Sequence, residues 1–164
     1  MLEEAENSIA QLNTSATGTI RIGASDMIFE YFLADKIVEY HEKFPAVKIE
    51  LMSDLSPRTL EALKANRCDV CFVNLPIALD PELSLHGNCM RLTDVFVTNE
   101  KHIELTRGVI PLAKLQEYPL ILLEQGTVAR RSLNSFVENV GIELKPAIEI
   151  GSWDLMKRLV IRGM

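Results

Sequence analysis

The stretch TIRIGASDMIFEYFLADKI, residues 19–37, decides the fold, because it changes from a strand pattern to a helix pattern within a few residues. Ile20 and Ile22 alternate with polar neighbours, which is the period of a half-buried strand. Apolar residues then recur at helical spacing, at Phe29, Phe32, Leu33, Ile37, Tyr40 and Phe44. The junction between the two patterns carries a hydroxyl and a carboxylate, Ser25 and Asp26.

The same strand-loop-helix order recurs along the chain. Further strands are predicted at VKIELM (47–52), CDVCFV (68–73) and RLTDVFVTN (91–99), and at the starts of 119–141 and 147–164. The continuous apolar run of 68–73 is typical of a strand covered on both sides. Helices are expected to follow Asp26, Ser56-Pro57, Thr127 and Ser152, and Gly141 is expected to end one of them. This alternation predicts parallel α/β units.

A hydroxyl residue stands at each of these strand-to-helix junctions: Ser25, Ser56, Thr127 and Ser152. Any one of them is explained as a helix N-cap, since Ser and Thr are preferred there. Together they also fit a ligand site, because parallel α/β sheets bind ligands at the carboxyl ends of their strands, where helix N-termini offer free N–H groups. We therefore expect a site for a small polar or anionic ligand, with both interpretations open for each residue.

Composition and charge narrow the classes of function. The 164 residues carry a net charge of -6, which argues against direct binding of nucleic acid. The basic pairs Arg130-Arg131 and Lys157-Arg158 fall on predicted helices and are interpreted as solvated charge. No membrane span or signal peptide is recognised, so a cytoplasmic chain with no membrane partner is expected.

Catalytic and cofactor motifs are absent from the sequence. Neither a dinucleotide-binding nor a P-loop glycine pattern occurs, and no histidine lies at a junction to support a nucleophile. Cys68 and Cys71 lie in a predicted buried strand and are expected to be packed thiols. Asp26, Asp54 and Glu124 are interpreted as solvated loop acids. We therefore predict a binding module with no cofactor and no metal, and not an enzyme.

The order and spacing of several stretches resemble the effector-binding domain of LysR-type transcriptional regulators. They are GTIRIGAS, KFP followed by VKIEL, LEALKANRCDVCFV, LILLEQGTVARRSLNSFVENVGI and IEIGSWDLMKRLVIRGM, and the resemblance extends over essentially all of residues 17–164. The resemblance implies an α/β fold like type 2 periplasmic binding proteins, with two Rossmann-like subdomains and a small-molecule site between them. It places effector-binding residues at Ser25, Asp26, Met27, Ser56, Gln125, Gly126, Thr127 and Arg130.

The resemblance also implies a domain organisation. Residues 1–16, with a coiled-coil-like seam at Leu2, Ala5, Ile9 and Leu12, correspond to the end of a linker helix and a linker. Residues 17–91 form subdomain I, and residues 92–164 form a crossover strand and subdomain II, which looks truncated at its C-terminus.

The implied partners are a small-molecule effector and further copies of the chain, in a homodimer or higher homo-oligomer. The implied dimer forms through the helix 26–44 and the strand 47–52. DNA is contacted only through an absent N-terminal winged helix-turn-helix. The expected function is effector sensing that modulates promoter binding. A free-standing solute-binding protein of the same fold, or an enzyme built on it, are the alternatives.

Overall fold

The computed structural model describes residues 16–87 and 89–164. These described residues divide into two compact units, one that ends at Ile77 (unit 1) and one that begins at Ala78 (unit 2). The predicted seam at Leu2, Ala5, Ile9 and Leu12 lies outside the described residues. The subdomain boundary predicted after residue 91 falls within unit 2.

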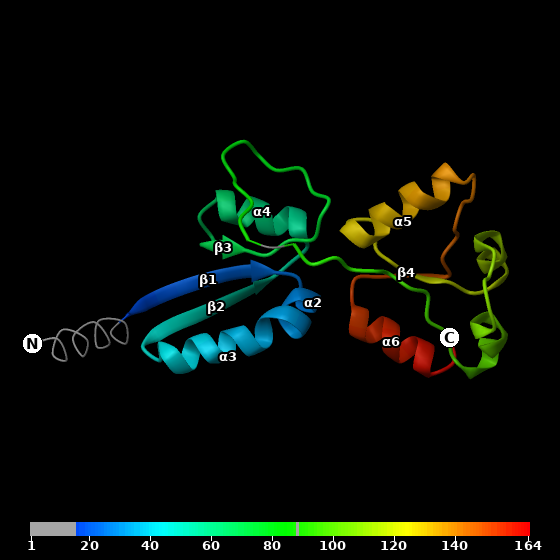
Figure 1. Cartoon of the computed structure of the whole chain (residues 1–164), viewed down its shortest axis with the longest axis horizontal. Helices are drawn as coiled ribbons and strands as arrows, with labels where there is room; N and C mark the ends of the chain where they lie inside the picture. The colour runs from blue at the N-terminus through cyan, green and yellow to red at the C-terminus, as the bar shows by residue number, and fades with distance from the viewer. Residues whose placement is uncertain (1–15, 88) are drawn as a thin grey trace, which may run out of the picture. The chain divides into compact units, whose positions relative to one another are not determined.

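Unit 1 contains a three-stranded parallel sheet in the order β2-β1-β3 (Figure 1). The central strand β1, Gly18–Ala24, pairs with β2, Val47–Ser53, along its whole length, from Gly18 opposite Val47 to Ala24 opposite Ser53. The short β3, Val70–Cys71, pairs with Ile22 and Gly23. Parallel pairing places the carboxyl ends of all three strands at one edge of the sheet.

The helix predicted after β1 forms, but it is not uniform. It consists of α2, Asp26–Ile28, the π-helical η1, Phe29–Leu33, and α3, Ala34–Lys43. Its apolar stripe packs on the sheet as the spacing predicts: Ile28 and Leu33 are buried with Ala24, against half-buried Phe29, Phe32 and Ile37. The helix α4, Ser56–Lys64, buries Thr59, Leu60 and Ala62 in the same unit.

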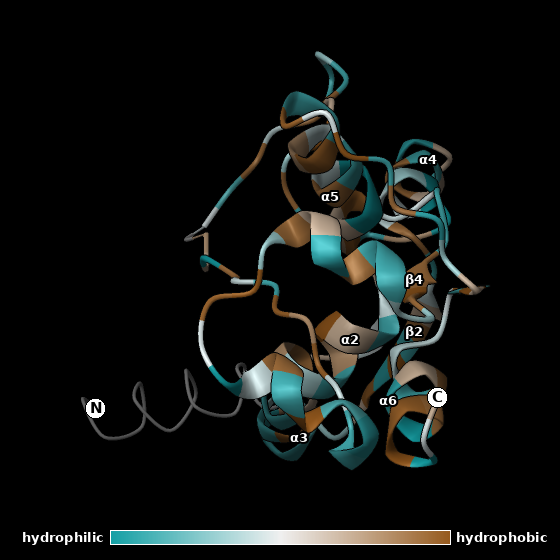
Figure 2. Cartoon of the chain, turned by 90° about the vertical axis from the view of Figure 1, so that its right-hand side faces the viewer, coloured by the Kyte–Doolittle hydropathy of each residue, from teal (hydrophilic) through white to brown (hydrophobic). Residues whose placement is uncertain are grey.

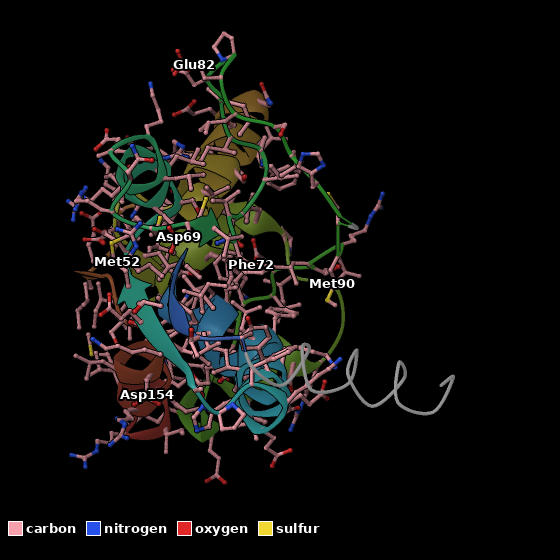
Figure 3. All side chains as sticks on the ribbon, turned by 90° about the vertical axis from the view of Figure 1, so that its left-hand side faces the viewer. Met52, Asp69, Phe72, Glu82, Met90 and Asp154 are labelled. Atoms are coloured by element: carbon pink, nitrogen blue, oxygen red, sulfur yellow. The ribbon has the colours of Figure 1, made fainter. Side chains whose placement is uncertain are left out.

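The prediction that residues 68–73 form a strand covered on both sides is wrong. Only Val70 and Cys71 are paired, and Val70 and Phe72 are 37% and 41% exposed. The strand is anchored at its start, where Arg21 donates to both carboxylate oxygens of Asp69, labelled in Figure 3, and to the backbone oxygen of Asn66 at 2.6 Å. The guanidinium and the Arg21 backbone N–H lower the pKa of Asp69.

Unit 2 contains a two-stranded parallel sheet of β4, Ile121–Leu123, and β5, Ile148–Ile150. Each strand leads into a predicted helix, α5, Val128–Asn139, and α6, Trp153–Ile161, and Gly141 has a positive φ of 71° just after α5. Hydrophobic and hydrophilic residues alternate along both helices (Figure 2). The core consists of buried Leu115, Leu120, Leu122, Val137 and Leu144.

Two 3₁₀ segments that the sequence pattern did not predict, η2, Glu100–Thr106, and η3, Leu112–Glu117, complete unit 2. The first holds the end of α6, because Asn99 donates to the carbonyls of Val160 and Met164 and the Lys101 ammonium donates to that of Gly163 at 2.8 Å. Carbonyls at a helix C-terminus lack intrahelical partners, so these contacts satisfy them.

The predicted strand at residues 91–99 does not form. No strand is assigned there, and its side chains are largely exposed, including Val95 at 74% and Val97 at 61%. Alternating apolar residues indicate a strand only where a neighbouring strand pairs with them, and none of the described strands does so. Across the described ranges, no helix is both long enough and apolar enough to cross a bilayer.

The close packing at Gly23 gives a test of the unit 1 fold. A Cβ at this position would lie 2.6 Å from Thr59 Cγ2 and 3.3 Å from Cys68 Sγ. Since Thr59 is fully buried and cannot turn away freely, we expect Gly23→Ala to lower the free energy of unfolding by about 1–3 kcal/mol. Urea denaturation followed by circular dichroism measures this change.

The matched control is Thr59→Ser, which deletes the clashing methyl and keeps a hydroxyl for the carbonyls of Asp54 and Leu55. The double variant Gly23→Ala/Thr59→Ser should be more stable than the sum of the two single changes predicts. Strict additivity would contradict the proposed contact.

Candidate functional site

In unit 1, predicted site residues lie where β1 and β2 end. Ser25 directly follows β1 and precedes α2, Asp26 is exposed in the first turn, and Met27 is half-buried. The Asp26 carboxylate accepts a short hydrogen bond from the Ser53 hydroxyl at the end of β2, and the backbone N–H of Asp54 donates to the Ala24 carbonyl. The parallel register therefore brings the ends of these two strands together.

Ser25 differs from the other junction hydroxyls because its oxygen has no partner. It occupies the N-cap position of α2, but its side chain makes no capping hydrogen bond. Its Oγ is a buried side-chain atom without a hydrogen-bond partner, the one such atom within the described part of the chain. Burying an unpaired hydroxyl costs free energy, and such groups are rare in folded proteins. Ser25 therefore needs an explanation beyond capping.

The expectation that Ser56 is an N-cap is wrong. The N-cap of α4 is Leu55, and Ser56 is the first helical residue. Its buried hydroxyl instead accepts the backbone N–H of Asn74 at 3.0 Å, which ties the segment after β3 to the start of α4. Asp54 supports the same turn, because its carboxylate accepts the N–H of Leu55 at 2.8 Å.

In unit 2, the cap interpretation holds for Thr127 and Ser152. Thr127 Oγ1 accepts the Arg130 N–H at 3.1 Å and donates to the Glu124 carbonyl at 3.0 Å, while Ser152 Oγ accepts the Leu155 N–H at 3.3 Å. Thr127 thus uses its one hydroxyl proton within the loop. The loop includes the exposed residues Gln125 and Gly126. The exposed side chain of Arg131 donates a hydrogen bond to the Gly126 carbonyl.

The interpretation of Arg130 as a solvated charge is wrong. Its side chain is only 3% exposed, whereas Arg131 is exposed as expected. The guanidinium donates to the Leu123 carbonyl at 2.7 Å and to Asn134 Oδ1 at 2.9 Å, and Nη1 lies 2.7 Å from Glu149 Oε1. Arg130 therefore joins the end of β4, the helix α5 and the strand β5.

The structure connects two predicted site residues, Gln125 and Arg130, through residues that sequence reasoning missed. Asn134 donates to Gln125 Oε1 at 3.0 Å, and Gln125 Nε2 donates to Glu149 Oε1 at 3.3 Å. Two weak signals were present in the sequence. Asn134 lies one helical turn beyond Arg130, and Glu149 is the polar residue between two strand isoleucines.

The thiols of Cys68 and Cys71 are packed in unit 1, as the sequence predicts. Burial raises the pKa values of Cys68 and Cys71, and Cys68 is buried against α4 with its Sγ 3.9 Å from the Thr59 carbonyl. A raised pKa lowers the thiolate fraction at neutral pH, so neither is an activated nucleophile. In the ranges that the structure describes, no group of three or more His, Cys, Asp or Glu side chains is arranged to hold a metal ion.

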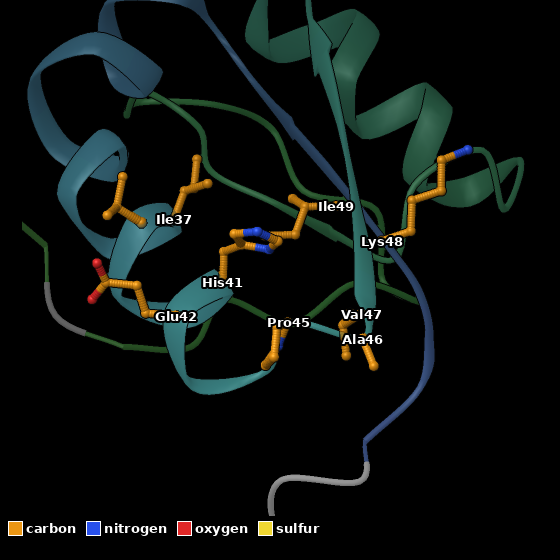
Figure 4. A pocket seen from close by; sticks show the side chains of 9 residues that line it. Ile37, His41, Glu42, Pro45, Ala46, Val47, Lys48 and Ile49 are labelled. Carbon is orange, nitrogen blue, oxygen red and sulfur yellow. The ribbon is translucent and has the colours of Figure 1, made fainter.

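A concave surface in unit 1 lies between α3 and β2 (Figure 4). Ile37 and His41 of α3 and Ile49 of β2 face it, and Val38, Glu42, Lys48 and residues 45–47 complete its lining. Val38 is 57% exposed, and β2 is an edge strand of its sheet. An apolar surface beside an unpaired strand edge suits association with another polypeptide.

Comparisons with known proteins agree with this architecture. The curated relative YeiE of Escherichia coli K12, described as an uncharacterized HTH-type transcriptional regulator, is 28% identical and matches 100% of this chain and 55% of its own length. The transcriptional activator CmpR of Synechocystis is 24% identical and matches 99% of this chain and 53% of its own. The chain thus spans about half the length of these relatives.

A comparison with a solved structure supports the assignment of the fold. The regulatory domain of Synechocystis CcmR, in complex with 2-PG, superposes with a TM-score of 0.68 at 18% identity, over 88% of this chain and 68% of that one. The chain has the type 2 periplasmic-binding-protein-like α/β fold predicted for it. The family model described as the LysR substrate binding domain matches residues 13–164. The chain therefore belongs to this family, the effector-binding domains of LysR-type transcriptional regulators.

Proposed function

We propose that this chain senses a small polar or anionic metabolite and, within a longer regulator, changes how that regulator binds promoter DNA. The relatives YeiE and CmpR are transcriptional regulators, which supports a regulatory role and not a catalytic one. The CcmR regulatory domain was solved in complex with 2-PG, which supports ligand binding by a domain of this fold. DNA contacts are assigned to a winged helix-turn-helix outside the 164 residues.

The observation that carries the proposal is the unpaired hydroxyl of Ser25 at the carboxyl end of β1. A buried hydroxyl without a partner gains a hydrogen bond when a polar ligand reaches it. Met27 and Asp26 in the adjoining helix turn, and Ser56 at the start of α4, complete the unit 1 contribution.

From unit 2, we propose that the 125–127 loop contacts the effector. Gln125 and Gly126 are exposed, and the Thr127 hydroxyl is engaged in the cap, so Gln125 and backbone N–H groups supply the contacts there. Arg130 is a further proposed site residue, which acts through the network that positions Gln125.

The surface between α3 and β2 is proposed to bind a second copy of the chain, which gives a homodimer or higher homo-oligomer. Its apolar lining, the edge position of β2 and the exposure of Val38 support this assignment. Tyr31 and Tyr40, which lie off the buried stripe of the helix, are 56% and 37% exposed and extend the same surface.

The first test removes the unpaired hydroxyl. A metabolite collection that includes 2-PG is screened by thermal shift, and the ligand found is titrated by calorimetry. Ser25→Ala should weaken its binding about twofold to tenfold, because one hydrogen bond contributes about 0.5–1.5 kcal/mol, while the free energy of unfolding stays equal or rises.

The matched control is Ser152→Ala, which removes a hydroxyl that caps α6. It should lower the free energy of unfolding by about 1 kcal/mol and leave ligand affinity unchanged. Equal affinity of Ser25→Ala and the unmodified protein would refute the role of Ser25.

Thr127 gives a separate prediction. Because its hydroxyl both accepts and donates within the loop, Thr127→Val should lower the free energy of unfolding by about 1 kcal/mol. If the backbone N–H groups make the ligand contact, affinity should change less than in Ser25→Ala. A large loss of affinity at constant melting temperature would instead assign the Thr127 hydroxyl to the ligand.

The assembly proposal is tested by charge insertion. Val38→Lys places an ammonium on the surface between α3 and β2 and should shift the sedimentation coefficient at micromolar concentration from dimer to monomer, since a desolvated charge opposes association. Val109→Lys, at a valine that is 99% exposed in unit 2, is the control and should remain dimeric. A monomeric unmodified protein, or a dimeric Val38→Lys variant, would contradict this interface.

A further inference from the structure

Four side chains of unit 2 form a closed ring of polar contacts. Arg130 donates to Asn134, Asn134 donates to Gln125, Gln125 donates to Glu149, and Glu149 Oε1 lies 2.7 Å from Arg130 Nη1. The ring therefore includes two of the residues proposed for effector binding, together with their internal partners. This inference rests on that proposed function and concerns the class of ligand.

The charge of Arg130 is already compensated within the ring. A guanidinium that is 3% exposed requires an anion close by, because an unpaired buried charge is strongly unfavourable. Glu149 supplies that anion, while its own side chain remains 44% exposed. An effector carboxylate that approached Arg130 would have to displace the Glu149 carboxylate, and would gain little net attraction from a neutral pair.

The other charges near this loop do not alter this balance. Glu124 directly follows β4, and Arg131 donates to the Gly126 carbonyl. Both side chains are exposed and opposite in sign, so their charges are well screened and largely offset each other. The hydrogen-bonding groups that remain at the 125–127 loop are the Gln125 amide and the backbone N–H groups, and all of them are uncharged.

We propose that Glu149 is a specificity-determining residue: its carboxylate occupies the position that a ligand anion would take beside Arg130. The unit 2 part of the site then selects an uncharged hydrogen-bonding group, such as a hydroxyl or amide, over a carboxylate or phosphate. Of the polar and anionic effectors allowed by the proposed function, the polar class is favoured at this loop.

The test measures anion binding without any effector. Glu149→Gln removes the charge that holds this side chain beside Arg130. Because the side chain at position 149 is 44% exposed, the neutral amide can turn toward solvent, and Arg130 should then become a receptor for an added anion. Melting temperatures are measured in inorganic phosphate and in sodium chloride of equal ionic strength. We expect a saturable gain in phosphate, on the order of 3 °C at ten times the dissociation constant, in Glu149→Gln beyond that of the unmodified protein.

The control is Glu143→Gln, which removes the same charge from an exposed pair in unit 2, where Glu143 and Lys145 are both 81% exposed. It should respond to phosphate like the unmodified protein. An equal response of Glu143→Gln and Glu149→Gln would overturn the proposal, since the effect would then follow net charge and not Arg130.

Two further measurements test whether the phosphate response depends on Arg130 and whether it can be measured if Glu149→Gln is unfolded. The double variant Arg130→Gln/Glu149→Gln should lose the phosphate response, and retention of the response would overturn the proposal. If Glu149→Gln is unfolded in sodium chloride, phosphate should restore its circular dichroism spectrum, and failure to do so would also overturn it. Because no effector is used, failure here leaves the Ser25 test of effector binding unaffected.

Discussion

The parallel pairing of β1 with both of its neighbours is the constraint on which unit 1 depends. The register from Gly18 opposite Val47 to Ala24 opposite Ser53 ends both strands at the same level, so that Ser25, Asp26 and Ser53 meet at one edge. The close packing of Gly23 on Thr59 allows α4 to lie against this sheet. Site geometry in unit 1 is therefore a consequence of strand register and not of the loops alone.

Unit 2 combines its hydrophobic core with a buried charge that connects its short strands to α5. Its strands are only three residues long, and Arg130 joins the end of β4, the helix α5 and the strand β5 by direct contacts. A buried ion pair contributes little net stability when it forms, but losing one partner is costly. Through Asn134, Arg130 also orients Gln125, so the packing of the unit and the proposed ligand contact depend on the same side chain.

The four junction hydroxyls show how one sequence pattern yields different chemistry. Thr127 and Ser152 cap their helices, Ser56 accepts a backbone N–H from the segment after β3, and Ser25 has no partner. All four residues follow a strand and precede a helix in the sequence. Their roles differ because each depends on which backbone groups the neighbouring elements bring within hydrogen-bonding distance.

From the sequence alone, the order and spacing of several stretches indicated the family by resemblance. The α/β class and most element positions followed from strand and helix periods and from Gly141 as a helix stop, because these are local properties. Sequence reasoning misjudged residues 68–73 and 91–99, since pairing depends on which other strand lies alongside. It also missed the burial of Arg130 and its partners Asn134 and Glu149, which come from α5 and β5. Only the tertiary structure decides such contacts, because burial and charge pairing are set by residues distant in the chain.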